Sequence, residues 1–172
     1  MTLRKILIEP DLILRKKCEP VEQVNDNIRK LIDDMLETMY DAPGIGLAAI
    51  QIGILKRVVV IDLSKDDGSK APISFINPEI TFTSKEKIKY EEGCLSIPGQ
   101  FAEIERPSEC HIKYFDYDGN LQKLKAQGLL ATCIQHEIDH LNGILFIDHL
   151  SKLKKNMIIK KLSKKKKKLE RV

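Results

Sequence analysis

The stretch Gln135-His136-Glu137-Ile138-Asp139-His140 is the part of the sequence around which we expect the rest of the fold to be organised. Residues four positions apart lie on one face of an α-helix, so His136 and His140 can direct two imidazole nitrogens at a single point. Such a pair suits a transition metal, and the adjacent Glu137 suits a carrier for the proton of a metal-bound water. The pattern predicts a helix with two metal ligands, and it requires a third ligand from elsewhere in the chain.

The residues around this motif predict a buried helix. Gly128 precedes it, Asn142-Gly143 is a typical C-terminal stop, and apolar residues occupy every side: Leu129, Leu130, Ala131, Cys133, Ile134, Ile138 and Leu141. Buried histidine and glutamate side chains need partners, which favours a metal site over a chance match to a short pattern. Asp139 lies about 100° around the helix from His140, so we expect it to point away from the shared face.

Length and composition describe one globular domain. The chain has 172 residues, of which 42% are hydrophobic and 31% charged. It contains no apolar run near the ~20 residues that span a bilayer, and residues 1–5 lack the apolar segment of a secretory signal. The cysteines Cys18, Cys94, Cys110 and Cys133 form no CxxC pair. These features predict a reduced, cytoplasmic protein without membrane contact.

The charge is unevenly distributed along the chain. Residues 151–172 contain 11 of the 29 basic residues and one of the 25 acidic residues, so the net charge of +4 combines an acidic body with a strongly basic tail. Apolar residues recur at helical spacing at the start of the tail (Leu150, Leu153, Met157, Ile158 and Leu162) and predict a helix that packs its first turns on the body. The following lysines, 164–168, are either a solvated end or an attachment segment for a polyanion.

The rest of the chain predicts an α+β fold. Apolar residues between Ile28 and Met39 follow the spacing of an amphipathic helix that Asn25 or Asp26 can cap. β-Branched and alternating residues then predict strands at 58–61, 73–76, 80–83, 88–92, 103–106, 111–117 and 121–126. Short strands with tight turns indicate antiparallel sheets packed around the buried motif helix, with an N-terminal amphipathic helix and a basic C-terminal helix.

Two further stretches carry residues suited to chemistry. Gly44-Ile45-Gly46-Leu47-Ala48-Ala49-Ile50-Gln51 allows close backbone approach, but it equally describes a turn between helix and strand, and Gln51 is either an amide donor or a surface residue. The stretch Glu92-Gly93-Cys94-Leu95-Ser96 contains a cysteine for which the sequence leaves three roles open. Cys94 can be a nucleophile, a metal ligand or an inert packing residue. We expect Pro98-Gly99 to form a turn after it. His111 and His149 are interpreted as structural.

Taken together, these two stretches and the His-Glu-x-x-His helix resemble peptide deformylase, in order and over nearly the whole chain. The resemblance, which is closest to the bacterial type I branch, implies a metal-dependent hydrolase that removes the formyl group from the initiator methionine of nascent polypeptides and releases formate. It implies a catalytic domain over 1–150 and a basic helical extension over 151–172. It also implies docking of that extension on the ribosome near the exit tunnel, and we expect a monomer.

The resemblance also implies roles for individual residues. Cys94, His136 and His140 would bind one divalent metal, with water in the fourth position. Glu137 would act as general base and then general acid, while Gln51 and the backbone N–H of Leu95 would hold the oxyanion. The family's usual metal is Fe²⁺ in the cell, although Zn²⁺, Ni²⁺ or Co²⁺ suits the same donors.

A pocket for the methionine side chain is implied by the same resemblance, with Ile45, Gly46, Tyr90, Glu92, Leu129, Thr132 and Cys133 as its residues. Two positions depart from many members of the family. Thr132 is often aliphatic there, and Phe101 is often arginine or tyrosine. Arg106 matches a common arginine, with either a structural or a substrate-steering role.

Three other interpretations compete with a deformylase. A zincin-type metallopeptidase shares the motif helix but needs a third ligand downstream, where Asp148 and His149 are the nearest candidates. A cysteine hydrolase would use Cys94 as nucleophile. A polyanion-binding module without enzymatic activity would bury the motif helix as core.

Overall fold

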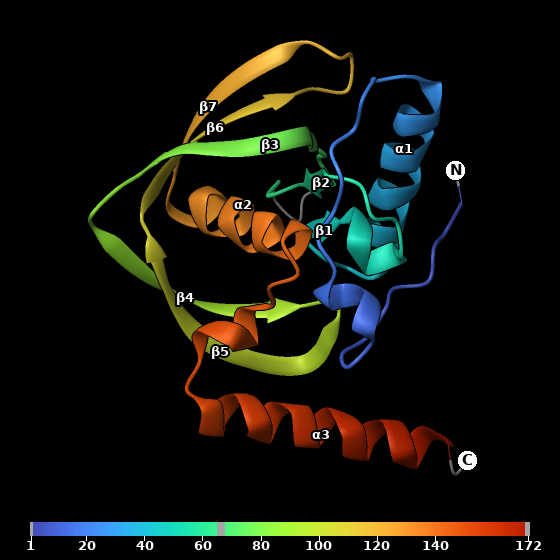
Figure 1. Ribbon diagram of the computed structural model, residues 1–172, viewed down its shortest axis with the longest axis vertical. Coiled ribbons are helices and arrows are strands. Elements are labelled where there is room, and N and C mark those ends of the chain that lie inside the picture. Colours follow the sequence, from blue (N-terminus) through green and yellow to red (C-terminus); the bar gives the residue numbers. More distant parts are fainter. Residues whose placement is uncertain (1, 65–67, 171–172) are drawn as a thin grey trace.

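The computed structural model describes residues 2–64 and 68–170, in which helix α2 lies between two antiparallel sheets (Figure 1). The larger sheet has the strand order β1-β2-β3-β6-β7, and the smaller sheet is the pair β4-β5. The strands are β1 Gly46–Ala48, β2 Val58–Ile61, β3 Ile73–Thr83, β4 Lys87–Cys94, β5 Ile97–Pro107, β6 Glu109–Phe115 and β7 Leu121–Gln127. The helices are α1 Asp26–Asp41, α2 Gly128–Leu141 and α3 Lys152–Glu170, with short 3-10 helices η1 Leu12–Arg15, η2 Ala49–Ile52 and η3 Phe146–His149. The predicted α+β class is confirmed.

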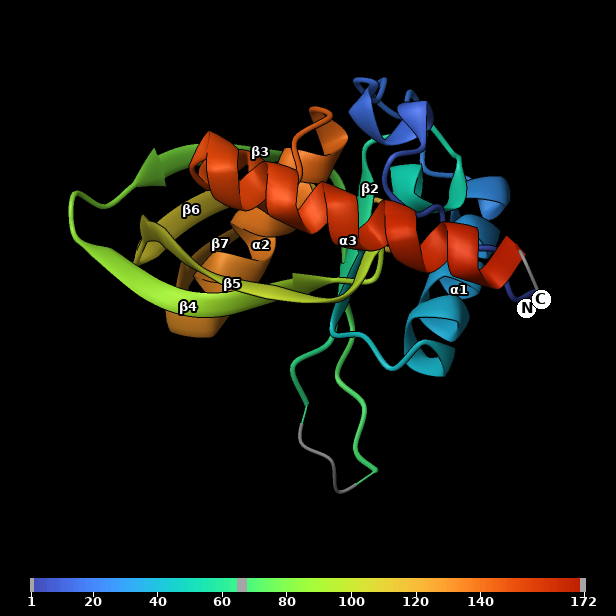
Figure 2. The same cartoon turned by 90° about the horizontal axis from the view of Figure 1, so that it is seen from below.

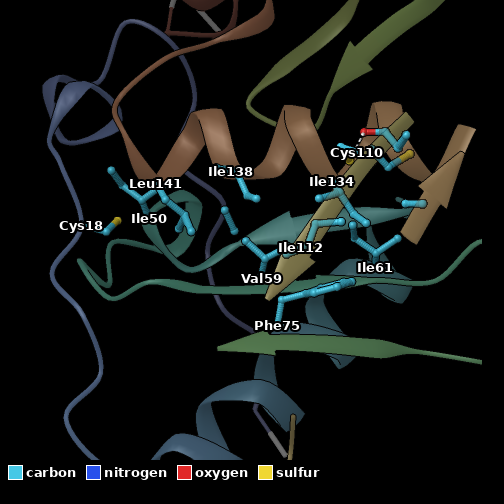
Figure 3. Packing of buried hydrophobic residues seen from close by; sticks show 14 residues of the cluster. Cys18, Ile50, Val59, Ile61, Phe75, Cys110, Ile112, Ile134, Ile138 and Leu141 are labelled. Atoms are coloured by element: carbon cyan, nitrogen blue, oxygen red, sulfur yellow. Dashed lines mark hydrogen bonds between the residues drawn. The ribbon is translucent and has the colours of Figure 1, made fainter. Parts of the chain in front are cut away.

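Strand β2 is buried along its whole length because helices cover both faces of the sheet at that point. Its side chains alternate, so Val59 and Ile61 pack in the cluster beneath α2, while Val58 and Val60 pack against α1. Figure 3 shows Val59 and Ile61 beside Ile134 and Ile138 of α2. This layer fixes α2 against the sheet.

Helix α1 forms over the predicted amphipathic stretch. The Asn25 side chain accepts a hydrogen bond from the backbone N–H of Ile28 and caps the helix, as the sequence predicts. Met35 and Met39 of the apolar stripe are fully buried. The packing of α1 against β1 and β2 supports the segment 46–52, which consists of β1 and η2.

The buried motif helix α2 begins at Gly128 and ends at Leu141, where the sequence predicts its limits. Its stop depends on Gly143, which has φ +76° and lies against the backbone carbonyl of Arg15, so a side chain there would clash. One apolar residue departs from the prediction of a helix buried on every side. Leu129 in the first turn is 44% exposed, because that turn reaches the mouth of a pocket.

Two predictions about the strands are wrong. The segments predicted at 73–76 and 80–83 form one strand, β3, with one register shift between Ile76 and Glu79, which spans Pro78, and a second between Ile80 and Phe82. Asn77 permits this by adopting φ +51° while its side-chain amide makes two hydrogen bonds of 2.8 Å with the backbone of Val21. The turn expected at Pro98-Gly99 instead lies at Leu95-Ser96. Pro98 and Gly99 belong to strand β5.

Helix α3 crosses the outer side of the β4-β5 pair (Figure 2). It is held there by Ile158 and Leu162, which pack with β5 and η3 residues in a third cluster. The prediction that its first turns would pack on the body is partly wrong, because Leu153 and Met157 are 72% and 51% exposed. The lysine run continues the helix and is exposed. Among the described residues, none of the helices is long and apolar enough to cross a membrane.

Candidate active site

Three metal-binding atoms converge at one end of the cleft between α2 and the β4-β5 pair. His140 Nε2 lies 3.3 Å from His136 Nε2 and 3.3 Å from Cys94 Sγ, and all three atoms lie within 4.8 Å of one another. A tetrahedral ion with metal–nitrogen bonds of 2.0–2.1 Å separates two nitrogen ligands by about 3.3 Å. The donor set and its spacing therefore fit a transition metal ion.

The third ligand, which the motif helix does not provide, comes from the end of β4. The pairing of β4 with β5 shifts register between Gly93 and Cys94, and Cys94 is a free, half-buried thiol. The two histidines approach from α2, one turn apart. Cys94 thus meets two histidines that lie more than 40 residues further along the chain, which sequence spacing alone does not predict.

A buried carboxylate orients the first histidine. Glu92 Oε1 lies 2.9 Å from His136 Nδ1, and Arg106 donates to both oxygens of Glu92 at 2.7 and 3.0 Å. Burial would raise the pKa of Glu92, but the hydrogen bonds from His136 and Arg106 lower it. The ionised carboxylate accepts the Nδ1–H of His136 and leaves the Nε2 lone pair facing the cluster.

The same arginine extends the network beyond the cluster. Arg106 Nη1 donates to Asp139 Oδ2 at 2.9 Å, and that oxygen lies 2.8 Å from His149 Nε2. Asp139 points away from the metal-binding face, as the helix geometry predicts. His149 contacts this network and lies outside the ligand cluster, in agreement with the structural role predicted for it.

Glu137 lies beside the ligand cluster with one oxygen free. Its Oε1 would be 2.6 Å from a Cβ atom at Gly46, so the carboxylate lies against the backbone where only glycine fits. Its Oε2 is buried and has no hydrogen-bond partner among the described residues. Burial raises the pKa of Glu137 to about 7, with a further contribution from the charge of Glu92 and opposition from His136 and Arg106. A carboxyl group with such a pKa can both accept and donate a proton near neutrality.

Gln51 is buried, which excludes the surface role that the sequence left open. Its carboxamide oxygen accepts the backbone N–H of Ala48 at 2.9 Å, and its nitrogen donates to Ser96 Oγ at 3.1 Å and lies 3.5 Å from Cys94 Sγ. These contacts direct the amide N–H groups toward the cluster. Ser96, fully buried, was missed as a functional residue although it ends the Cys94 stretch.

A cavity of ≈ 640 Å³ opens beside the cluster. Gln51, Leu95 and Glu137 line this cavity. Its lining also includes all the residues predicted for the methionine side-chain pocket, namely Ile45, Gly46, Tyr90, Glu92, Leu129, Thr132 and Cys133. Ile6 and Ile8 of the N-terminal segment also line the cavity, as do Pro98 and Gly99, and no sequence pattern indicates this for any of the four. Phe101 borders it with 63% of its side chain exposed.

Comparison with known proteins gives consistent matches over this chain. The family model described as polypeptide deformylase matches residues 3–156. The peptide deformylase of Pelagibacter ubique is 63% identical over 164 residues, which cover 95% of this chain and 95% of that protein. The crystal structure of the Ehrlichia chaffeensis peptide deformylase in complex with actinonin has a TM-score of 0.92 and 47% identity, covering 96% of this chain and 98% of that chain. A Legionella pneumophila peptide deformylase has a TM-score of 0.91 and 45% identity, covering 99% of both chains.

Proposed function

The chain belongs to the polypeptide deformylase family, and from this premise we propose how its own residues carry out the reaction. The family's reaction is the metal-dependent removal of the N-formyl group from nascent polypeptides. The observation that supports the residue assignment is the convergence of Cys94, His136 and His140 beside the unpaired Oε2 of Glu137. A hydrolase acting on a linear amide needs this combination of a metal site and a proton carrier.

Cys94, His136 and His140 would hold one divalent ion and leave a coordination position open, as in catalytic metal sites. When bound, the ion supplies Lewis acidity and lowers the pKa of water. A thiolate with two imidazoles suits iron, zinc, nickel and cobalt, so the donors do not select one metal. We assign Fe²⁺ as the ion in the cell on the family resemblance.

Glu137 moves the proton. As general base it takes a proton from the attacking water, and as general acid it gives that proton to the amine nitrogen when the formyl C–N bond breaks. Formate and a free N-terminus are released. The amide of Gln51 and the backbone N–H of Leu95 donate hydrogen bonds to the oxygen that becomes negative during attack.

Glu92 holds His136 and does not contact the substrate in this account, although its position borders the cavity. Both of its oxygens already accept hydrogen bonds. Ile45, Gly46, Tyr90, Leu129, Thr132 and Cys133 then enclose the methionine side chain. The nascent chain leaves through the open side of the cavity, toward Phe101.

The chain would act as a monomer in the cytoplasm, with its catalytic residues in 1–150 and a docking segment in 151–172. The docking role is supported by α3, in which the buried residues form one narrow stripe and the lysines at 164–168 are exposed. Such a row of cations suits the phosphates of ribosomal RNA near the peptide exit.

Formate release from formyl-Met-Ala-Ser by protein purified without oxygen tests this assignment. We expect equimolar formate and free Met-Ala-Ser, and no cleavage of a blocked peptide without a formyl group. Cleavage of internal peptide bonds with no formate would identify a zincin-type peptidase instead. Full activity in the presence of a chelator would identify a cysteine hydrolase that uses Cys94.

A further inference from the structure

Thr132 lines the cavity and carries a buried hydroxyl without a hydrogen-bond partner among the described residues. The residue lies on α2 and is 3% exposed. A buried hydroxyl without a partner is unfavourable, and such groups usually bind water or a ligand. An aliphatic residue of the same shape would avoid this cost.

The contrast with Thr38 on α1 shows that the unpaired state is not a general property of threonine in this chain. Thr38 Oγ1 donates to the backbone carbonyl of Asp34, one turn earlier, at 2.7 Å. This is the usual way in which a threonine hydroxyl inside a helix is satisfied. Thr132 makes no such bond, so its hydroxyl has no partner within its own helix.

The position of Thr132 relative to the metal ligands indicates which substrate atom it meets. It lies four residues before His136 on the same face of α2, a rise of about 6 Å along the helix axis. In a methionine residue the sulfur is four bonds from the formylated nitrogen, a reach on the order of 5 Å. With the formyl carbon beside His136, the end of the first side chain therefore approaches Thr132.

The other side chains on this wall are poor hydrogen-bond donors. Leu129 is apolar, and Cys133 is a neutral thiol because burial raises its pKa to about 12. We propose that Thr132 Oγ1 donates a hydrogen bond to an acceptor at the sulfur position, so that this enzyme deformylates N-terminal formyl-methionine sulfoxide as well as formyl-methionine. This inference rests on the proposed function and specifies the substrate class of the same pocket. A sulfoxide oxygen is a strong acceptor, whereas a thioether is a weak one.

The test compares kcat/KM for formyl-Met-Ala-Ser, its sulfoxide and the norleucine analogue. In Thr132→Val, which keeps the shape and removes the donor, the sulfoxide-to-thioether ratio should fall about 3–10-fold, the range of one neutral hydrogen bond. The norleucine-to-methionine ratio should rise, because norleucine carries no acceptor. Calorimetric affinities of the product peptides Met-Ala-Ser and its sulfoxide should shift in the same direction.

Three further variants keep the test decisive. Thr132→Ser retains the hydroxyl and should keep the wild-type ratio, while Thr132→Ala should lose it, even if the valine variant fails to fold. Thr38→Val removes a hydroxyl from a residue that does not line the cavity, and it should not change the ratio. Ratios equal within twofold for wild type and the variants lacking the hydroxyl would overturn the inference. Absence of formate from the thioether peptide with wild type would instead overturn the proposed function.

Discussion

Helices α2 and α3 have opposite relations to the rest of the protein. In α2, ten of fourteen residues are buried, and its polar side chains are aimed at a cavity or at buried partners. In α3, two of nineteen residues are buried, Ile158 and Leu162, and the lysines of its last turns are exposed. A buried polar group acts through fixed geometry, whereas exposed charges act through their summed field and are screened by salt.

This contrast predicts that single substitutions in and around α2 change catalysis. In α3, several lysines must be altered together before docking changes. Chemistry and docking would then be separable.

The largest effect is expected for Glu137→Gln. Removal of the proton carrier should lower turnover about 10²–10⁴-fold, the usual contribution of general acid–base catalysis, while metal content stays near one ion per chain. Metal analysis and formate release measure the two quantities. The exposed Glu103 provides a control, because Glu103→Gln should change neither. Loss of metal from Glu137→Gln, or normal turnover, would contradict the proposed role.

Cys94→Ser should weaken metal binding, since a hydroxyl is a poorer ligand than a thiolate for these metals. Formate release should fall in parallel with metal content. Oxidation of the Cys94 sulfur in the wild type should have a similar effect, because the oxidised group is no longer a thiolate ligand. Cys110→Ala, at a buried cysteine outside the ligand cluster, should retain the metal. Full activity of Cys94→Ala would remove this residue from the metal site.

Arg106→Ala should destabilise the fold by about 3–5 kcal/mol, because it leaves the buried Glu92 without its ion-pair partner. It should also weaken metal binding about 10–100-fold, since Glu92 would no longer be held against His136. Urea unfolding and metal titration measure both effects. Arg29→Ala breaks an ion pair with the exposed Asp26 and should cost about 0–1 kcal/mol. Equal losses in the two variants would show that Arg106 has no special role.

Deletion of residues 163–172 should have the smallest effect on chemistry. The cut leaves Ile158 and Leu162 in their packed positions, so cleavage of formyl-Met-Ala-Ser should stay within about twofold of wild type. Co-sedimentation with ribosomes should fall at low salt, where exposed lysines bind phosphates most strongly. Glutamine at 164–168 in the full-length chain should reproduce this loss. Equal sedimentation of truncated and full-length protein would leave α3 as a charged end only.

The same contrast explains what the sequence could predict. The limits of α2, its burial and the alignment of His136 with His140 follow from helical periodicity and local stop signals, which are properties of neighbouring residues. The contact with Cys94 depends on how β4 meets α2, and only the family resemblance indicated it. The cavity contacts of Ile6 and Ile8 likewise depend on tertiary structure alone.

The prediction that the first turns of α3 pack on the body is partly wrong for a geometric reason. A helix on a surface buries one stripe, and Met157 lies 100° around the helix from Ile158, so the two cannot both face the β4-β5 pair. Periodicity identifies apolar residues but does not say which of two stripes is covered. The network from Glu92 through Arg106 to Asp139 was missed for a related reason. Arg106 pairs with Ile88 across the hairpin, so even the correct strand register does not predict its contact with Glu92.

Deformylation by this chain should require one metal ion held by Cys94, His136 and His140. This requirement can be tested if the metal is stripped under anaerobic conditions and Fe²⁺ is added back while formate release from formyl-Met-Ala-Ser is followed. We expect no activity in the stripped protein and a linear return that stops at one equivalent of Fe²⁺ per chain. Formate release without added metal, or the same return in a protein with His140→Ala, would contradict it.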